Sequence, residues 1–382
     1  MNEPSNKPHP RLDTIDFVRG FVMILMALDH ARIYFSNADF SPTNLEQTNA
    51  AWFLTRWITH FCAPTFILLA GTSAFLYGER GHTKRQLAVF LFTRGLWLIL
   101  LELTVIRFAW TFDLGFQRSM GTVIWAIGWS MIFLAPLIFL PPRAVLAIGV
   151  VMIAGHNLLD SIRAESLGSF AWLWKVLHER GRISLGDGYT FSVVYPLIPW
   201  IGVMAAGFGM GPLFRLEPAT RKKWLVAVGI SLTLAFIALR ASNLYGDPRP
   251  WAHQERPWFT LFSFLNCSKY PPSLLYLLMT LGPVLLVLGL LENSRIHPPK
   301  QIIVFGRVPF FFYILHFFLL HGLAVLTRSV DTLISPDAES PGRFGLPGVY
   351  LIWLIAVLAL YPLCTRFAAL KQRSQSRWLS YF

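Results

Sequence analysis

The chain has 382 residues, of which 54% are hydrophobic and 14% charged, and its mean hydropathy is +0.51. Soluble domains carry about 25% charged residues, so this composition excludes a soluble globular protein and predicts an integral membrane protein. The net charge of +13 is compatible with nucleic-acid binding. In a multispan protein, however, excess Lys and Arg normally reflects the positive-inside bias, so no nucleic-acid partner is expected.

Apolar runs of near 20 residues recur along the chain, each long enough to cross a hydrocarbon core of about 30 Å. They predict an all-α polytopic membrane protein, a bundle of 10 or 11 transmembrane helices in a single domain over residues 1–382. The predicted spans are 14–35, 52–78, 87–109, 119–139, 144–162, 190–214, 223–241, 273–291, 302–326 and 347–368.

The distribution of Lys and Arg predicts the orientation of this bundle. With the N-terminus inside, the short inside connections and the tail hold Lys7, Arg11, Arg80, Lys84, Arg85, Arg143, Arg215, Arg221, Lys222, Lys223, Arg295, Lys300, Lys371, Arg373 and Arg377. The outside connections, 36–51, 163–189, 242–272 and 327–346, are longer and poorer in basic residues. Both termini are therefore predicted to be cytoplasmic.

Ionisable residues inside the spans collect in their outer halves. Each costs roughly 2.5 to 3.5 kcal/mol at a helix centre, so such residues mark function or ion pairing. The outer set is Asp29, His30, Arg56, His60, Glu102, Arg107, His156, Asp160, Arg240, His316 and His321. Single pairs, such as Glu102 with Arg107 or His156 with Asp160, are better explained as structural ion pairs than as functional groups. The whole set predicts a water-filled outer cavity.

The inner halves carry a smaller set that is dominated by arginine: Asp16, Arg19, Arg94 and Arg307. Arginine pairs well with phosphates and carboxylates, so an inner anion-binding vestibule is one interpretation, and interfacial anchoring is the other. Arg19 and His30 lie eleven residues apart, roughly 16 Å along one helix. The first span would therefore link the two vestibules.

The connections and small residues add further expectations. Segments 243–251 and 263–273 mix turn formers with polar and aromatic groups, as binding loops do. Segment 168–178 is expected to form a short interfacial helix, and Gly207 with Gly211 is expected to allow close helix packing. The cysteines Cys62, Cys267 and Cys364 have no ligand-like spacing, so neither a disulfide framework nor a metal site is expected.

The histidines and carboxylates of the outer set and the arginines of the inner set fit an acyl-transfer reaction. A histidine of near-neutral pKa is a natural general base for a hydroxyl or amine. Asp29 and His30 point about 100° apart on a helix, so Asp29 is not automatically the orienting partner, and His60 or Glu102 would serve equally. An inner anion site would suit a phosphorylated acyl carrier.

The opening RLDTIDFVRGFVMILMALDHARIYF, with Arg19 and His30 in an R-x10-H arrangement, resembles the first helix of the transmembrane acyltransferase superfamily, which includes the acyltransferase-3 proteins. The wider pattern resembles bacterial relatives of heparan-alpha-glucosaminide N-acetyltransferase, in RWITHFCAPTFILLAGTSAFL, TRGLWLILLELTVIRF, YPLIPWIGVMAAGFGMG, LNCSKYPPSLLYLLMTLGP and FGRVPFFFYILH. The resemblance implies an enzyme of the bacterial inner membrane. It would move an acyl group, usually acetyl, from cytoplasmic acyl-coenzyme A to a saccharide or other acceptor outside.

The resemblance leaves the catalytic base open. In the eukaryotic enzymes the catalytic His precedes the second helix, whereas here the nearest is His60, inside the second span. His30 is the first expectation and His60 the second, with Asp29 beside them. Donor binding is expected at Arg19, Arg94 and Arg307, and acceptor binding at Arg56, Glu102, Arg107, Asp160, Arg240, Lys269 and His316. A secondary transporter or flippase is the alternative function, although no internal repeat supports it.

Overall fold

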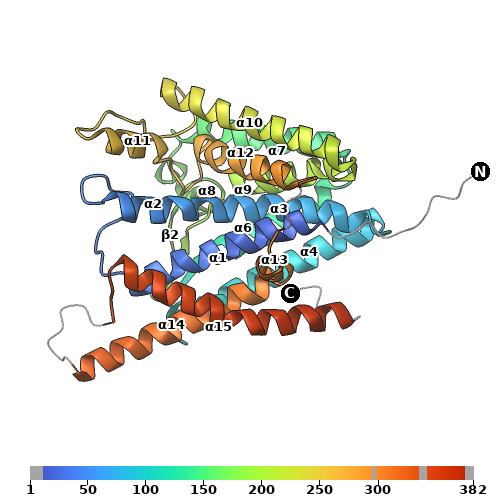
Figure 1. Cartoon of the computed structure of the whole chain (residues 1–382). Coiled ribbons are helices and arrows are strands. Elements are labelled where there is room, and N and C mark those ends of the chain that lie inside the picture. Colours follow the sequence, from blue (N-terminus) through green and yellow to red (C-terminus); the bar gives the residue numbers. More distant parts are fainter. Residues whose placement is uncertain (1–11, 295–297, 335–341, 375–382) are drawn as a thin grey trace, which may run out of the picture.

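The computed structural model of the chain describes residues 12–294, 298–334 and 342–374, and helices make up most of it (Figure 1). Every predicted span contains a helix or consecutive helical segments. Their bounds are α1 Asp13–Phe35, α2 Ala50–Ile58 with η1 Thr59–Phe61 and α3 Cys62–Gly78, α4 Lys84–Leu101 with η2 Glu102–Ile106 and α5 Arg107–Thr111, α6 Val123–Leu137, α7 Pro142–Gly155 with η3 His156–Leu159, α9 Leu197–Gly209 with η5 Gly211–Arg215, α10 Pro218–Ser242, α12 Leu274–Leu291, α13 Lys300–Arg307, α14 Pro309–Ile334 and α15 Leu346–Arg373.

Among the described residues, 8 of these helical segments are long and apolar enough to cross a membrane. α6 is apolar but shorter, and α1 carries Asp16, Arg19 and Asp29 in its interior. The prediction of a multi-pass helical membrane protein is confirmed. Figure 1 shows the long helices running side by side, with α10 and α12 on one side of the bundle and α14 and α15 on the other.

Small residues allow the central helices to approach closely. A Cβ atom added at Gly207 in α9 would lie 2.1 Å from the Leu68 carbonyl oxygen of α3, and one added at Gly211 would lie 2.1 Å from the ring of Phe75. Only a residue without a side chain fits there. The expected packing role of Gly207 and Gly211 is confirmed.

The prediction of helices alone missed a small sheet. Strands β1 Arg118–Gly121, β2 Gly181–Gly186 and β3 Tyr189–Val193 form the order β1-β3-β2, with β1 parallel and β2 antiparallel to β3. The β2–β3 turn has positive φ at Asp187 and Gly188, which is the usual signature of an Asp-Gly hairpin. Predicted spans 119–139 and 190–214 therefore each begin with a strand rather than a helix.

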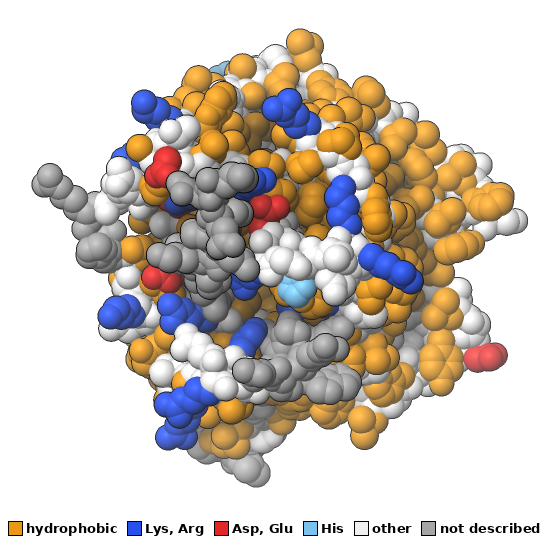
Figure 2. Space-filling model, turned by 90° about the vertical axis from the view of Figure 1, so that its right-hand side faces the viewer, with side chains coloured by type: hydrophobic (Ala, Val, Ile, Leu, Met, Phe, Trp, Pro, Cys, Tyr) orange, Lys and Arg blue, Asp and Glu red, His pale blue; other side chains and the backbone are white. Residues whose placement is uncertain are grey.

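The two ends of the bundle differ. One end carries the sheet, η4 Ala164–Phe170, α8 Ala171–Leu177 and α11 Pro257–Leu265; α8 lies within the predicted short helix at 168–178. At the other end, Leu12 before α1 and Lys371 near the end of α15 line one cavity, so the described ends of the chain share a side. Figure 2, a view onto this end, shows Lys and Arg side chains around its middle and hydrophobic side chains at its edge.

That grouping of basic residues agrees with the positive-inside argument, and the cytoplasmic location of the termini stays a prediction. Lys7, Arg11, Arg295 and Arg377, which also entered that argument, lie outside the described residues. We call the end with Leu12 and Lys371 the inner end and the end with the sheet the outer end.

Candidate functional site

A cavity of about 420 Å³ opens at the inner end of the bundle. It is lined by Arg19 of α1, Arg94 of α4 and Arg307 of α13, so the structure brings together the three residues predicted to bind the donor. Arg19 Nη2 donates a hydrogen bond of 2.7 Å to Ser73 Oγ, and Arg307 pairs with Asp13 at 3.2 Å.

The rest of this inner cavity is largely apolar. Further along α1 it is lined by Met23 and Met26, and α14 contributes Phe310 and Tyr313. Tyr313 also packs edge-on against His30, with ring centroids 6.3 Å apart. The inner cavity thus combines guanidinium groups with a largely apolar wall, and this wall includes Tyr313, which contacts His30.

A second cavity, of about 680 Å³, opens at the outer end. Among the residues predicted to bind the acceptor, Arg56, Asp160 and Lys269 line it, and so does His60. Glu102, Arg107, Arg240 and His316 do not line this cavity. The prediction of one shared outer set was therefore correct for part of it only.

Tyr270 also lines the outer cavity, and the sequence reasoning did not select it. The Lys269 Nζ atom lies 5.4 Å from its ring centroid, and the Arg180 guanidinium carbon lies 5.2 Å from it on a cation–π geometry. Although burial raises the pKa of the Tyr270 hydroxyl, the charges of Lys269 and Arg56 lower it below the ordinary value. Arg56, Arg180 and Lys269 thus place positive charge around Tyr270, while Asp160 and Glu179 also line the cavity.

Arg240 organises the wall of the outer cavity from behind. Its buried guanidinium donates to the carbonyl oxygens of Arg249 at 2.7 Å, Phe264 at 2.9 Å and Ser263 at 3.0 Å. Asp247 joins the same segments, since its carboxylate accepts hydrogen bonds from the backbone and hydroxyl of Ser268. The two predicted binding loops, 243–251 and 263–273, are therefore held together as one wall.

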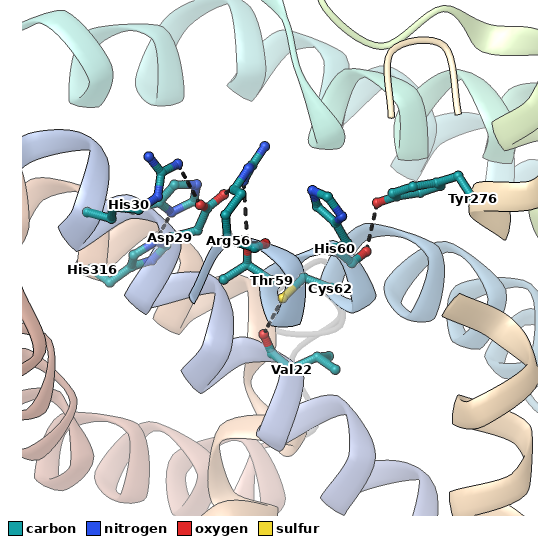
Figure 3. A network of polar contacts seen from close by, with 10 residues as sticks. Val22, Asp29, His30, Arg56, Thr59, His60, Cys62, Tyr276 and His316 are labelled. Atoms are coloured by element: carbon teal, nitrogen blue, oxygen red, sulfur yellow. Dashed lines mark hydrogen bonds and ion pairs between the residues drawn. The ribbon is translucent and has the colours of Figure 1, made fainter. Parts of the chain in front are cut away.

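His30 lines neither cavity and is hydrogen-bonded to another histidine. Its Nδ1 atom lies 2.6 Å from His316 Nε2 (Figure 3). His316 Nδ1 in turn lies 3.0 Å from the Phe312 carbonyl oxygen. A carbonyl only accepts, so His316 Nδ1 must carry a proton, and the neutral His316 must accept at Nε2. His30 then donates from Nδ1, which leaves its Nε2 lone pair available as a base.

Asp29 does not orient His30, which answers the question left open by their 100° separation. Its carboxylate binds Arg56 Nη1 at 2.5 Å and Arg32 Nη2 at 2.9 Å. Arg56 lines the outer cavity, so Asp29 fixes a cavity residue while His316 orients the histidine. Sequence reasoning assigned His316 to the acceptor, and its contact with His30 places it elsewhere.

His60 is placed by a break in its helix. Pro64 has no N–H to donate to the His60 carbonyl, and that carbonyl instead accepts a hydrogen bond of 2.7 Å from the Tyr276 hydroxyl. The segment tightens into the turn η1, and Arg56 and His60 project on the same side of it (Figure 3). His60 Nδ1 has no hydrogen-bond partner among the described residues.

Glu102 and Arg107 do not pair with each other, contrary to the ion pair considered from the sequence. Glu102 begins the π-helical turn η2 and accepts hydrogen bonds from Thr122 N at 2.8 Å and Thr122 Oγ1 at 2.5 Å, at the start of α6. Arg107 Nη2 binds Asp113 at 2.5 Å, and its Nε donates to the Arg118 carbonyl at 3.0 Å. Both residues thus anchor the outer ends of helices.

His156 and Asp160 are close, as expected, but the hydrogen bond of Asp160 goes to His178 after α8. The distance from Asp160 Oδ1 to His178 Nε2 is 3.0 Å, and Asn157 Nδ2 donates to Asp160 Oδ2 at 2.8 Å. Burial raises the pKa of Asp160, but the hydrogen bonds from His178 and Asn157 lower it below the ordinary value. His178 was missed because 18 residues separate it from Asp160.

Comparison with known protein families gives a match over more than half of the chain. The model of the family described as heparan-alpha-glucosaminide N-acetyltransferase, catalytic, matches residues 11–245. This range includes Arg19, His30, His60 and Arg94, while α12, α13, α14 and α15, with Arg307 and His316, lie beyond it. No curated protein matches the chain.

Proposed function

The chain belongs to the family of heparan-alpha-glucosaminide N-acetyltransferase catalytic domains, and from that premise we propose how this membrane acetyltransferase works. An acyl-coenzyme A, with acetyl-CoA as the first choice, enters the inner cavity from the cytoplasm and binds there. Its acyl group passes to a saccharide-like acceptor in the outer cavity. The observation that carries the proposal is that His30 has a neighbour in each of two cavities at opposite ends of the bundle. Tyr313, which packs against its ring, lines the inner cavity, and Arg56, which pairs with the adjacent Asp29, lines the outer one.

The inner cavity has the chemistry that a coenzyme A thioester needs. Arg19, Arg94 and Arg307 would pair with its phosphates, because guanidinium groups bind phosphate in a planar fork. The apolar wall formed by Met23, Met26 and other residues would hold the pantetheine arm. The thioester carbonyl would then lie near Tyr313 and His30.

In the transfer step, His30 Nε2 removes a proton from the acceptor hydroxyl or amine. The acceptor atom attacks the thioester carbonyl carbon and forms the ester or amide, while the carbon–sulfur bond breaks. The coenzyme A thiolate leaves with the proton that His30 took up. General base catalysis of this kind contributes about 10²- to 10⁴-fold to a rate.

On the acceptor side, Arg56, Asp160 and Lys269 are proposed to hold the hydroxyl and charged groups of a saccharide. His60, which lines the same cavity, is the alternative base. The localisation that goes with this direction of transfer is the bacterial cytoplasmic membrane, with the outer end facing away from the cytoplasm.

The test is acyl transfer by purified protein in nanodiscs, with radiolabelled acetyl-CoA and a panel of amino sugars. We expect His30→Ala to lower kcat about 10²- to 10⁴-fold while acetyl-CoA binding is retained. The matched variant His60→Ala is expected to keep most of the activity. The reverse ranking would make His60 the base.

A secondary transporter or flippase is the second candidate, favoured by the two cavities at opposite ends of the bundle. It predicts counterflow of an intact solute in proteoliposomes with no covalent product. Transfer of label to an acceptor, with no counterflow, would exclude it.

A further inference from the structure

Three side chains that could ligate a metal ion converge at the outer end of the bundle. His156 follows α7, Asp160 lies one helical turn further along, and His178 follows α8. One potential ligand atom from each lies within 4.8 Å of the other two. In a tetrahedral zinc site the ligand atoms are roughly 3.3 Å apart, given metal–ligand bonds of about 2.0–2.1 Å. Small rotations of the two imidazoles would close the difference.

The buried side chain of His156 lacks hydrogen-bond partners among the described residues. It is 2% exposed, and neither of its ring nitrogens makes a hydrogen bond to any residue that the structure describes. His178 Nδ1 also lacks a partner among the same residues. Buried polar atoms are rarely left unsatisfied, and an unpaired one calls for a bound ion or another explanation.

The surroundings resemble the supporting shell of a metal site. Asn157 Nδ2 donates to Asp160 Oδ2, and Asn157 Oδ1 accepts a hydrogen bond of 2.8 Å from the backbone of Leu274 at the start of α12. This chain fixes the carboxylate against a rigid helix. Ligating carboxylates are usually held by such second hydrogen bonds.

We propose that His156, Asp160 and His178 bind one divalent transition-metal ion, Zn²⁺ being the best match. Two imidazoles and one carboxylate are a usual ligand set for zinc sites that keep an open position. Asp160 and His178 line the outer cavity, so the open position faces that cavity. No metal site was predicted from the sequence, because the prediction rested on cysteine spacing. His156 and Asp160 were paired from their local spacing, and nothing in the sequence connected His178 to them.

The ion would also tie the segment that contains α8 to the end of α7. Without it, these elements are joined at this point by the 3.0 Å hydrogen bond from His178 to Asp160, a 2.9 Å hydrogen bond from Trp174 Nε1 to the Ile162 carbonyl and the ring contact of His156 with His178. Metal binding therefore predicts an effect on stability as well as an occupied site. This inference does not depend on the acyl transfer proposed above.

The test uses full-length protein in nanodiscs, stripped with a chelator and then titrated with Zn²⁺ and with Co²⁺. We expect one ion per chain by elemental mass spectrometry, visible d–d absorption bands for the Co²⁺ form and a higher melting temperature with Zn²⁺. His156→Ala and Asp160→Asn should weaken binding at least 100-fold and abolish the thermal shift. His253→Ala, which removes an exposed histidine of the outer connections, is the matched control and should bind as the wild type does.

Binding that is equal in wild type, His156→Ala and Asp160→Asn would overturn the proposal, as would absence of zinc from the wild type at micromolar concentrations. If His156→Ala fails to fold, Asp160→Asn, which keeps the size of the side chain, carries the test. Wild-type protein that binds zinc but shows no acyl transfer would contradict the proposed function and leave the inferred metal site standing.

Discussion

At the scale of single residues, the proposed function depends on which ring nitrogen of His30 carries the proton. The hydrogen bonds from His30 Nδ1 to His316 Nε2 and from His316 Nδ1 to the Phe312 carbonyl fix both tautomers. His316 is thus a positioning residue. In the proposed mechanism it determines which nitrogen of His30 carries the proton, and it does not itself take a proton from the acceptor.

We expect His316→Ala to lower kcat with little change in the KM for acetyl-CoA, because the donor still binds while His30 loses its fixed tautomer and ring orientation. His316→Gln should restore part of the activity, since its amide oxygen can accept the His30 Nδ1 proton near the place of the lost nitrogen. Steady-state kinetics and the pH profile of kcat measure both effects. Equal activity of the Ala and Gln variants would show that the hydrogen bond has no such role.

At the scale of secondary structure elements, the polar residues sit where helices are interrupted. The turn η1 carries His60, the π-helical turn η2 begins at Glu102, and α13 ends at Arg307 before the break at Val308 and Pro309. Each interruption frees backbone groups or changes the direction of side chains. In an uninterrupted helix, the side chains of these residues would point in other directions.

The break at Pro64 makes a prediction for a double-mutant cycle. Tyr276→Phe removes the hydroxyl that binds the His60 carbonyl and should cost about 1–3 kcal/mol of stability, because a buried acceptor is left unpaired. In a Pro64→Ala background the new N–H can donate to that carbonyl, so the same change should cost less. Unfolding in denaturing detergent measures both costs, and equal values in the two backgrounds would mean that Pro64 does not free the carbonyl.

At the scale of the whole molecule, the bundle has a cationic inner cavity and a polar outer cavity at opposite ends. The proposed transfer across the membrane needs two such cavities, because its donor and its acceptor are in different aqueous compartments. The direction of transfer depends on which end faces the cytoplasm.

We expect an impermeant thiol reagent to label Leu185→Cys, in the exposed β2–β3 hairpin, on intact spheroplasts, and to label Arg143→Cys only after the membrane is opened. Both changes are made in a background in which the buried Cys62, Cys267 and Cys364 are replaced by alanine. The physical reason is that the positive-inside bias places Arg143 in the cytoplasm. The opposite pattern would invert the assignment of donor and acceptor cavities.

The sequence by itself determined the class of protein, the approximate position of every span and the packing role of Gly207. These depend on local hydrophobicity and residue size, which the sequence contains directly. The Asp-Gly turn at 187–188 was also readable from the sequence and was overlooked.

Only the tertiary structure decided which polar groups meet. Arg19, Arg94 and Arg307 share one cavity, whereas Glu102 binds Thr122 and Arg107 binds Asp113. His30 binds His316, which lies 286 residues further along the chain. Side-chain pairing depends on how each helix is rotated about its axis and on where prolines and π-helical turns interrupt it. Those rotations are set by packing between distant segments, and hydropathy along the chain does not encode them.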